Sequence, residues 1–193
     1  MKKISTLFKK DPNDLSRVIN EVDPKNAWAL TEGFATRKFD GTACAIIDGK
    51  LYKRYDVKRN KQTGLFPDPP LDAIPCQEPD PNGHWPHWVK CDRSDPSDRW
   101  HFEAFDKFDY WNDGTYELLG TKINGNPENL PGHFLWKHGH EFFANYDLVR
   151  TYEGIKSFLM VTDIEGIVFH HHDGRMCKIR KSDFGIKRHQ ATT

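Results

Sequence analysis

The sequence lacks any hydrophobic run of the length that a membrane-crossing helix needs. Apolar runs such as residues 158–161 are only a few residues long, whereas about 20 consecutive apolar residues are needed to cross a bilayer. The basic start, Met1–Lys3, is followed by an apolar stretch that Lys9 and Lys10 interrupt too soon for a signal-peptide core. We therefore expect a cytoplasmic protein without a membrane span.

The sequence also has few cysteines and no net charge. Its four cysteines, Cys44, Cys76, Cys91 and Cys177, form no C-x-x-C pair, which removes the usual zinc and thioredoxin patterns and favours reduced thiols. Lys plus Arg and Asp plus Glu number 28 each, so the formal net charge is zero. Such a chain does not coat nucleic acid through many phosphate contacts, and we expect any nucleic-acid contact to be local.

Aromatic residues compensate for a modest content of other apolar residues. The hydrophobic fraction is 37% and the aromatic fraction 13%; the former lies below the usual value of about 45–50%. Because each aromatic ring can bury about 150–250 Å², we expect a packed core. The length of 193 residues predicts one main domain.

Two β-hairpins are the clearest local structures. The first lies within residues 43–55, where two β-prone runs flank Asp48-Gly49, a pair typical of a type I′ turn. The second lies within residues 164–180, where two runs flank a short Gly-containing loop. A further strand is predicted over residues 115–120.

Helices are expected in few places. Residues 97–110 and 151–161 carry apolar side chains at helical spacing, and weaker patterns indicate a short helix over residues 14–19 and a strand over residues 27–30. Residues 65–98 hold most of the prolines and predict an irregular excursion that packs down through its tryptophans. Hairpins with a few helices and no β-α-β alternation predict an α+β fold built on antiparallel β-sheets with flanking helices.

One short motif carries a residue suited to nucleophilic chemistry. Lys38 opens a Lys-x-Asp-Gly sequence with Asp40 and Gly41, just before the first hairpin, where a side chain can project from a strand end. Alone, the tetrad is typical of a surface lysine before a turn. Its weight comes from the charged residues that follow it in order: Arg54 on the return strand, Glu117 in an apolar strand, Glu165 beside a glycine, and Lys178 with Arg180 at period two.

This ordered set resembles the covalent nucleotidyltransferase superfamily of ligases and capping enzymes. Within it, the sequence is closer to a family of short ATP-dependent RNA ligases that join 5′-phosphate to 3′-hydroxyl ends. The similarity covers roughly residues 35–187. It is carried by Lys38 to Thr42; by Asn82-Gly83-His84 with Pro86, Trp88 and Val89; by Glu117 to Thr121 with Asn124 to Pro127; and by Ile164 to Val168 with Asp173, Gly174 and Lys178.

The resemblance implies a nucleotidyltransferase (ligase adenylation) fold over residues 35–188. Residues 1–34 would be an N-terminal extension packing on this core and residues 189–193 a tail, without an OB-fold domain. The implied enzyme is a monomeric ATP-dependent RNA ligase that uses ATP and Mg²⁺ or Mn²⁺. Its partner would be RNA with 5′-phosphate and 3′-hydroxyl ends.

The resemblance also implies a nucleotide-binding set around the nucleophile. Lys38 would receive AMP through a covalent bond, with Asp40 and Gly41 beside it in the same motif. Glu117 would be the partner of the ribose hydroxyl. Arg54 would contact the ribose or the RNA 5′-phosphate.

The remaining residues supply charge around the reacting phosphate. A lysine amine attacks phosphorus only when it is neutral, and neighbouring cations lower its pKa toward that state. Lys178, as the α-phosphate contact, and Arg180 would do this, while Glu165 would be the catalytic acid that supplies a metal ligand or proton acceptor. The final motif usually ends in lysine, and whether Arg180 or Lys181 acts as its second cation stays open.

Other interpretations also stay open. A small DNA ligase or guanylyltransferase would use the same motifs, and a non-catalytic nucleic-acid-binding relative would keep the fold. Glu117 has a structural alternative as an edge-strand surface acid, and Lys178 with Arg180 as a solvated strand face. His170 to His172 lack the spaced partners of a zinc site and are interpreted as exposed hairpin-end residues.

Overall fold

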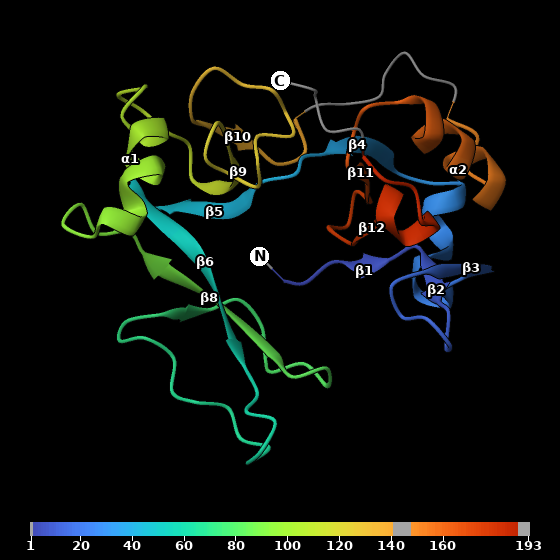
Figure 1. Ribbon diagram of the computed structural model, residues 1–193, viewed down its shortest axis with the longest axis horizontal. Coiled ribbons are helices and arrows are strands. Elements are labelled where there is room, and N and C mark those ends of the chain that lie inside the picture. The colour runs from blue at the N-terminus through green and yellow to red at the C-terminus, as the bar shows by residue number, and fades with distance from the viewer. Residues whose placement is uncertain (1, 141–147, 189–193) are drawn as a thin grey trace. The chain divides into compact units, whose positions relative to one another are not determined.

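The computed structural model describes residues 2–140 and 148–188 (Figure 1). The chain divides into two compact units. The described residues of the first unit are 2–3 and Asp40–His138, and those of the second are Ile4–Phe39, 139–140 and 148–188. None of the helices among these residues is long and apolar enough to cross a membrane.

The first unit is built on a six-stranded sheet whose neighbouring strands are all antiparallel. The predicted first hairpin is confirmed, because Asp48 and Gly49 adopt the positive φ angles, 49° and 67°, that a type I′ turn requires. The predicted strand over residues 115–120 is confirmed as β9 (Gly114–Leu119). In spatial order the strands are β10 (Phe134–Lys137), β9 (Gly114–Leu119), β5 (Thr42–Ile47), β6 (Lys50–Lys58), β8 (His84–Lys90) and β7 (Ile74–Pro75).

The predicted excursion over residues 65–98 is irregular only in part. Strand β8 lies inside it and pairs with β6 from Tyr52 opposite Lys90 to Lys58 opposite His84 (Figure 1). Because proline is uncommon inside strands, the prolines of this segment argued against a strand here. Pro86 has no N–H to donate, but its carbonyl accepts a hydrogen bond from the Cys76 N–H at 2.9 Å.

The helix predicted over residues 97–110 forms but is shorter. It consists of a 3₁₀ turn, η2 (Pro96–Asp98), followed by α1 (Arg99–Phe105). The indole N–H of Trp111 donates to the Phe105 carbonyl at 2.8 Å, and the two rings stack at 5.9 Å. Because this bond takes the carbonyl that a longer helix would use, the chain leaves the helix here.

The second unit contains a four-stranded sheet in the order β1 (Ser5–Thr6), β12 (Met176–Arg180), β11 (Gly166–His170) and β4 (Phe34–Lys38). Its strands are antiparallel except for β1, which runs parallel to β12. The predicted second hairpin is confirmed as β11 and β12. The predicted α+β fold built on antiparallel sheets is confirmed in both units, apart from the parallel pairing of β1 with β12.

Helix α2 (Tyr152–Val161) confirms the prediction over residues 151–161. The Thr151 side chain accepts a hydrogen bond from the Gly154 N–H at 3.1 Å and so caps the helix. Ile155 and Leu159 are completely buried in the core of this unit. Side chains from the four-stranded sheet share this core, among them Ala35, Ile167, Phe169, Cys177 and Ile179.

Both weak predictions in the first 34 residues are wrong. The segment expected as a helix over residues 14–19 ends in a small second sheet of β2 (Phe8–Lys10) and β3 (Val18–Val22). The segment expected as a strand over residues 27–30 lies in a 3₁₀ helix, η1 (Pro24–Leu30). Asp23 starts this helix by accepting from the Lys25 N–H at 3.1 Å. All four cysteines are free, in keeping with the reduced thiols expected from their spacing.

Candidate active site

Strand pairing in the second unit brings Lys38 and Arg180 level with each other across Gly166. Lys38 is the last residue of β4, and Gly166, the first residue of β11, is the register partner of both Lys38 and Arg180. Residues that pair across antiparallel strands project from the same face of the sheet. The two cations therefore share one face, with no side chain between them at Gly166.

Lys178 projects from that same face, two residues before Arg180 on β12. The alternate residues Ile167, Phe169 and Ile179 point to the opposite face, and each is completely buried in the core. The orientation of Lys178 and Arg180 is thus fixed, because a shift of the strand register by one residue would move these apolar side chains out of the core.

Glu165 forms an ion pair with the Lys38 ammonium group. The exposed fractions of the two side chains are 22% for Lys38 and 20% for Glu165. The Lys38 Nζ also donates to its neighbour, the Phe39 carbonyl, at 3.2 Å. Glu165 is itself fixed in the chain, since its carbonyl accepts the Lys181 N–H at 2.9 Å.

The charge on Lys178 is disfavoured by its surroundings. Burial, followed by repulsion from Lys38 and Arg180, lowers its pKa from 10.5 to about 8, although Glu165 and Asp183 oppose the change. Three cations therefore meet on one sheet face with two carboxylates. Such a concentration of positive charge suits an anion with several oxygens, such as a phosphate.

Sequence reasoning missed Asp183, a completely buried carboxylate that holds Arg180 in place. It accepts the Arg180 main-chain N–H at 2.9 Å and the guanidinium Nε and Nη2 at 3.3 and 3.0 Å. Lys10, on β2, donates to the same carboxylate at 2.7 Å. Burial alone would favour protonation, but these donors hold the pKa of Asp183 below its usual value. The only sequence signal is an acid at the third position of η3 (Lys181–Phe184).

Gly166 is a glycine for a steric reason. A Cβ atom on this residue would lie 2.3 Å from the Ile179 carbonyl oxygen and 2.8 Å from the Arg180 Cα. Both contacts are with backbone, so they cannot be relieved by a side-chain rotation. The glycine in the predicted Glu-Gly motif therefore allows β12 to pair closely beside Glu165.

The other half of the Lys-x-Asp-Gly motif, Asp40 and Gly41, lies in the first unit. Asn124 donates from its side-chain amide to the Asp40 carboxylate and to the Gly41 carbonyl, both at 3.0 Å. The Asp40 N–H donates to the Glu128 carboxylate at 3.1 Å. Asn124, in the Asn124 to Pro127 segment that carries part of the resemblance, thus fixes this loop, a link that sequence order alone did not indicate.

Glu117 lies on β9 next to Gly41. A Cβ atom on Gly41 would lie 2.3 Å from the Leu118 carbonyl oxygen and 2.8 Å from the Glu117 Cγ, so glycine permits this close approach. The Glu117 side chain is 12% exposed, and its carboxylate pairs with the His138 Nε2 at 2.8 Å. Glu117 is therefore not a solvated surface acid, and His138 is a partner that sequence reasoning missed.

Arg54 lies on β6 of the same unit, opposite Trp88 on β8. Its guanidinium carbon is 5.7 Å from the centre of the Trp88 ring, within the range of a cation–π contact. The structure thus brings Lys38, Glu165, Lys178 and Arg180 together in the second unit. It brings Asp40, Gly41 and Glu117 together in the first unit.

The interpretation of the internal histidines as exposed hairpin-end residues is wrong for His171. His171 is buried. Its Nε2 atom lies 2.7 Å from a carboxylate oxygen of Glu32, and its Nδ1 atom lies 2.8 Å from a carboxylate oxygen of Asp173. His170 stacks on Phe34 with ring centres 5.0 Å apart. These contacts give both histidines a packing role.

Comparisons with known proteins support the resemblance to RNA ligases that the sequence motifs indicate. A family model described as RNA ligase 1 matches residues 107–193. A Rattus norvegicus protein named RNA ligase 1 is 28% identical over 222 residues, covering 79% of this chain and 67% of the rat protein. The Pongo abelii protein of the same name is 29% identical over 221 residues, covering 78% and 67%. The Danio rerio one is 30% identical over 140 residues, covering 56% and 43%. The chain spans about two thirds of the mammalian relatives, and its resemblance to an RNA ligase family is confirmed.

Proposed function

We propose that this protein is an ATP-dependent RNA ligase that joins 5′-phosphate to 3′-hydroxyl ends through a covalent lysyl-AMP intermediate. The observation that carries the proposal is the Lys38–Glu165 ion pair on a sheet face that also bears Lys178 and Arg180. The relatives named RNA ligase 1 support the choice of RNA as substrate. We assign both units to a nucleotidyltransferase fold on the same grounds.

In the first step the Lys38 amine attacks the α-phosphorus of ATP. A bond forms between Nζ and phosphorus, and the bond to the pyrophosphate oxygen breaks. At an unperturbed pKa near 10.4, less than about 0.1% of a lysine is neutral at pH 7, so the ammonium group must lose a proton. The Glu165 carboxylate is placed to take it, since it already accepts a hydrogen bond from Nζ.

Lys178 and Arg180 serve the same step from the neighbouring strand. Their positive charges stabilise the negative charge that develops on the phosphoryl oxygens. Asp183 keeps Arg180 pointed along this face through two hydrogen bonds to its guanidinium group. We therefore assign the second cation of the motif to Arg180, because Lys181 is buried in η3.

The later steps reuse these groups. An oxygen of the RNA 5′-phosphate attacks the phosphorus of the bound AMP and releases the Lys38 amine. The 3′-hydroxyl of the second end then attacks the RNA phosphate and expels AMP. Each step is a displacement at phosphorus that needs positioning and cations more than new functional groups.

The donor set also fits a magnesium ion. Glu165 offers a partly exposed carboxylate, a hard oxygen ligand of the kind that Mg²⁺ takes together with phosphate oxygens. When bound, the metal would neutralise phosphate charge and polarise the phosphoryl group.

In the first unit, Glu117 and Arg54 would bind the nucleotide or the RNA end. The Glu117 carboxylate already accepts from His138 and has the acceptor capacity that a ribose hydroxyl requires. Asp40 and Gly41 contribute a loop held by Asn124. Arg54 would contact ribose or the 5′-phosphate while stacked on Trp88.

Incubation with ATP or GTP labelled at the α-phosphate, followed by a denaturing gel, tests the proposal. We expect a labelled protein band with ATP and Mg²⁺, and sealing of a 5′-phosphorylated RNA by the same preparation. Labelling with GTP alone would indicate a guanylyltransferase. Labelling with neither nucleotide would indicate a non-catalytic binder and would overturn the ligase assignment.

A further inference from the structure

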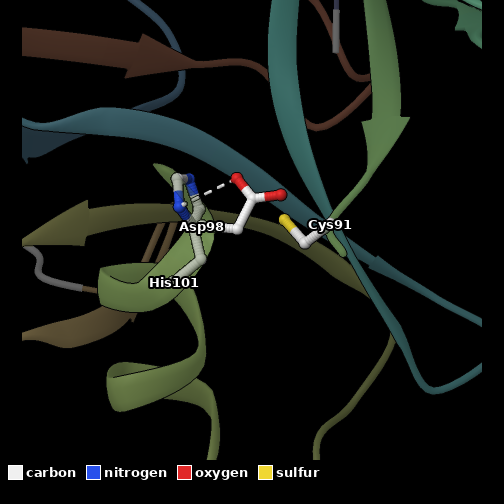
Figure 2. A group of neighbouring side chains, drawn as sticks. All are labelled: Cys91, Asp98 and His101. Atoms are coloured by element: carbon white, nitrogen blue, oxygen red, sulfur yellow. Dashed lines mark ion pairs between the residues drawn. The ribbon is translucent and has the colours of Figure 1, made fainter. Parts of the chain in front are cut away.

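Three potential metal ligands converge in the first unit, apart from the residues discussed above. They are Cys91, directly after β8; Asp98, the last residue of η2; and His101, in the first turn of α1. One ligand atom from each lies within 4.8 Å of the others, and all three residues are buried. In Figure 2 the three side chains converge, with the Asp98 carboxylate drawn between the His101 ring and the Cys91 sulfur.

His101 has polar atoms that its surroundings do not satisfy. The residue is 8% exposed, and neither ring nitrogen has a hydrogen-bond partner within the described part of the chain. The nearest carboxylate oxygen, on Asp98, lies 3.8 Å from Nδ1, beyond hydrogen-bond distance. A buried imidazole without partners is uncommon and calls for a ligand.

Asp98 is oriented as metal-binding carboxylates usually are. One oxygen accepts from the Lys53 ammonium group at 2.6 Å and the other from the Asp92 N–H at 3.0 Å. Each carboxylate oxygen has two lone pairs, so both keep acceptor capacity. Hydrogen bonds of this kind fix the direction of a ligand carboxylate and are the usual second layer of a metal site.

We propose that Cys91, Asp98 and His101 bind a zinc ion, with water as the fourth ligand. Thiolate with imidazole and carboxylate suits Zn²⁺, whereas Mg²⁺ takes oxygen ligands. Tetrahedral bonds of about 2.0 to 2.3 Å place ligand atoms roughly 3.3 to 3.7 Å apart, so the cluster needs a closure of about 1 Å. The ion would tie the start of α1 to the end of β8.

The competing explanation is that Lys53, instead of a metal ion, balances the negative charge of this cluster. Lys53 also approaches Asp95 at 3.4 Å, so its charge is shared between two carboxylates. The Cys91 thiolate and the Asp98 carboxylate would together carry two negative charges. These charges would neutralise the divalent ion and so limit its repulsion by Lys53. The Lys53 explanation leaves both His101 nitrogens without partners, whereas a zinc ion satisfies one of them and uses the Cys91 thiol.

Cobalt titration of the 193-residue chain tests the site. The chelator-treated protein is titrated with Co²⁺, and Zn²⁺ is then added to displace it in the presence of excess Mg²⁺. We expect one equivalent per chain and the charge-transfer absorption of a cobalt–thiolate bond. Cys91→Ser and His101→Gln should weaken binding at least about tenfold, while Cys76→Ser, which alters a cysteine outside the cluster, should leave it unchanged. Unchanged binding in both cluster variants would overturn the proposal.

A measurement on the unaltered protein covers the case in which the variants fail to fold. X-ray absorption at the zinc edge of the zinc-loaded protein should give one sulfur ligand together with nitrogen and oxygen ligands. A sulfur-free shell would overturn the site, as would the absence of bound zinc at micromolar concentration. Neither outcome bears on the ligase proposal, which involves none of these three residues.

Discussion

Replacing Lys178 by methionine should stabilise the fold while abolishing adenylylation. Methionine keeps the length of the side chain and removes the charge. At pH 7 the lysine is charged in both the folded and the unfolded chain, but in the folded chain it is partly buried and faces Lys38 and Arg180. The free energy of unfolding is therefore lowered by the presence of this cation.

The pKa of Lys178 sets the size of the effect. The fall from 10.5 in the unfolded chain to about 8 in the folded protein corresponds to about 3 kcal/mol at 1.36 kcal/mol per pKa unit. Solvent screens a partly exposed charge, so we expect Lys178→Met to raise the free energy of unfolding by about 1 to 2 kcal/mol at pH 7.

The sign of the pH dependence follows from proton binding. Between about pH 8 and 10.5 the unfolded chain holds a proton on Lys178 that the folded protein has released, so the stability of the wild-type protein rises relative to the variant with increasing pH. The advantage of the variant should be complete below pH 8, should shrink through this interval and should vanish above it.

Urea denaturation followed by tryptophan fluorescence measures this difference, at pH 7 and at several values up to pH 10.5. Groups shared by both proteins cancel when wild type and variant are compared at each pH. Lys187→Met, at an exposed position in the same unit, is the matched control and should change stability by less than about 0.5 kcal/mol. Destabilisation by Lys178→Met at pH 7, or a difference independent of pH, would refute the reasoning.

Other substitutions and substrates test the remaining assignments. Lys38→Arg should lose the covalent AMP adduct on a denaturing gel, because guanidinium stays charged; an adduct at normal yield would remove Lys38 as nucleophile. Glu165→Ala should slow adduct formation at least about 10²-fold, and a near wild-type rate in saturating Mg²⁺ would argue for a structural role. Asp183→Asn should lower the free energy of unfolding by about 2 to 4 kcal/mol in urea denaturation, since two cations lose their buried partner; a change below 0.5 kcal/mol, on the order of a surface substitution, would contradict the network. A 3′-terminal deoxyribonucleotide should slow joining more than protein adenylylation, because nucleic acid enters after the first step; equal sealing of nicked DNA would favour a DNA ligase.

The sequence by itself determined the local elements and the residue types of the candidate site. Asp48-Gly49 specified a hairpin because its turn geometry depends on two adjacent residues. Thr151 and the apolar spacing after it specified α2 in the same local way. The order of Lys38, Glu165 and Lys178 pointed to one chemistry before any of them was placed.

The tertiary structure decided what these residues touch. Gly166 aligns Lys38 with Arg180 only because β4 pairs with the β11–β12 hairpin, which follows it by more than a hundred residues in the chain. The second cation on Asp183 is likewise supplied from a distant segment, because Lys10 on β2 donates to the carboxylate that holds Arg180. Local patterns extend over a few residues, whereas burial and cross-strand register depend on which distant segments share a core. For that reason the sequence identified the charged residues, and only the folded chain determined their partners.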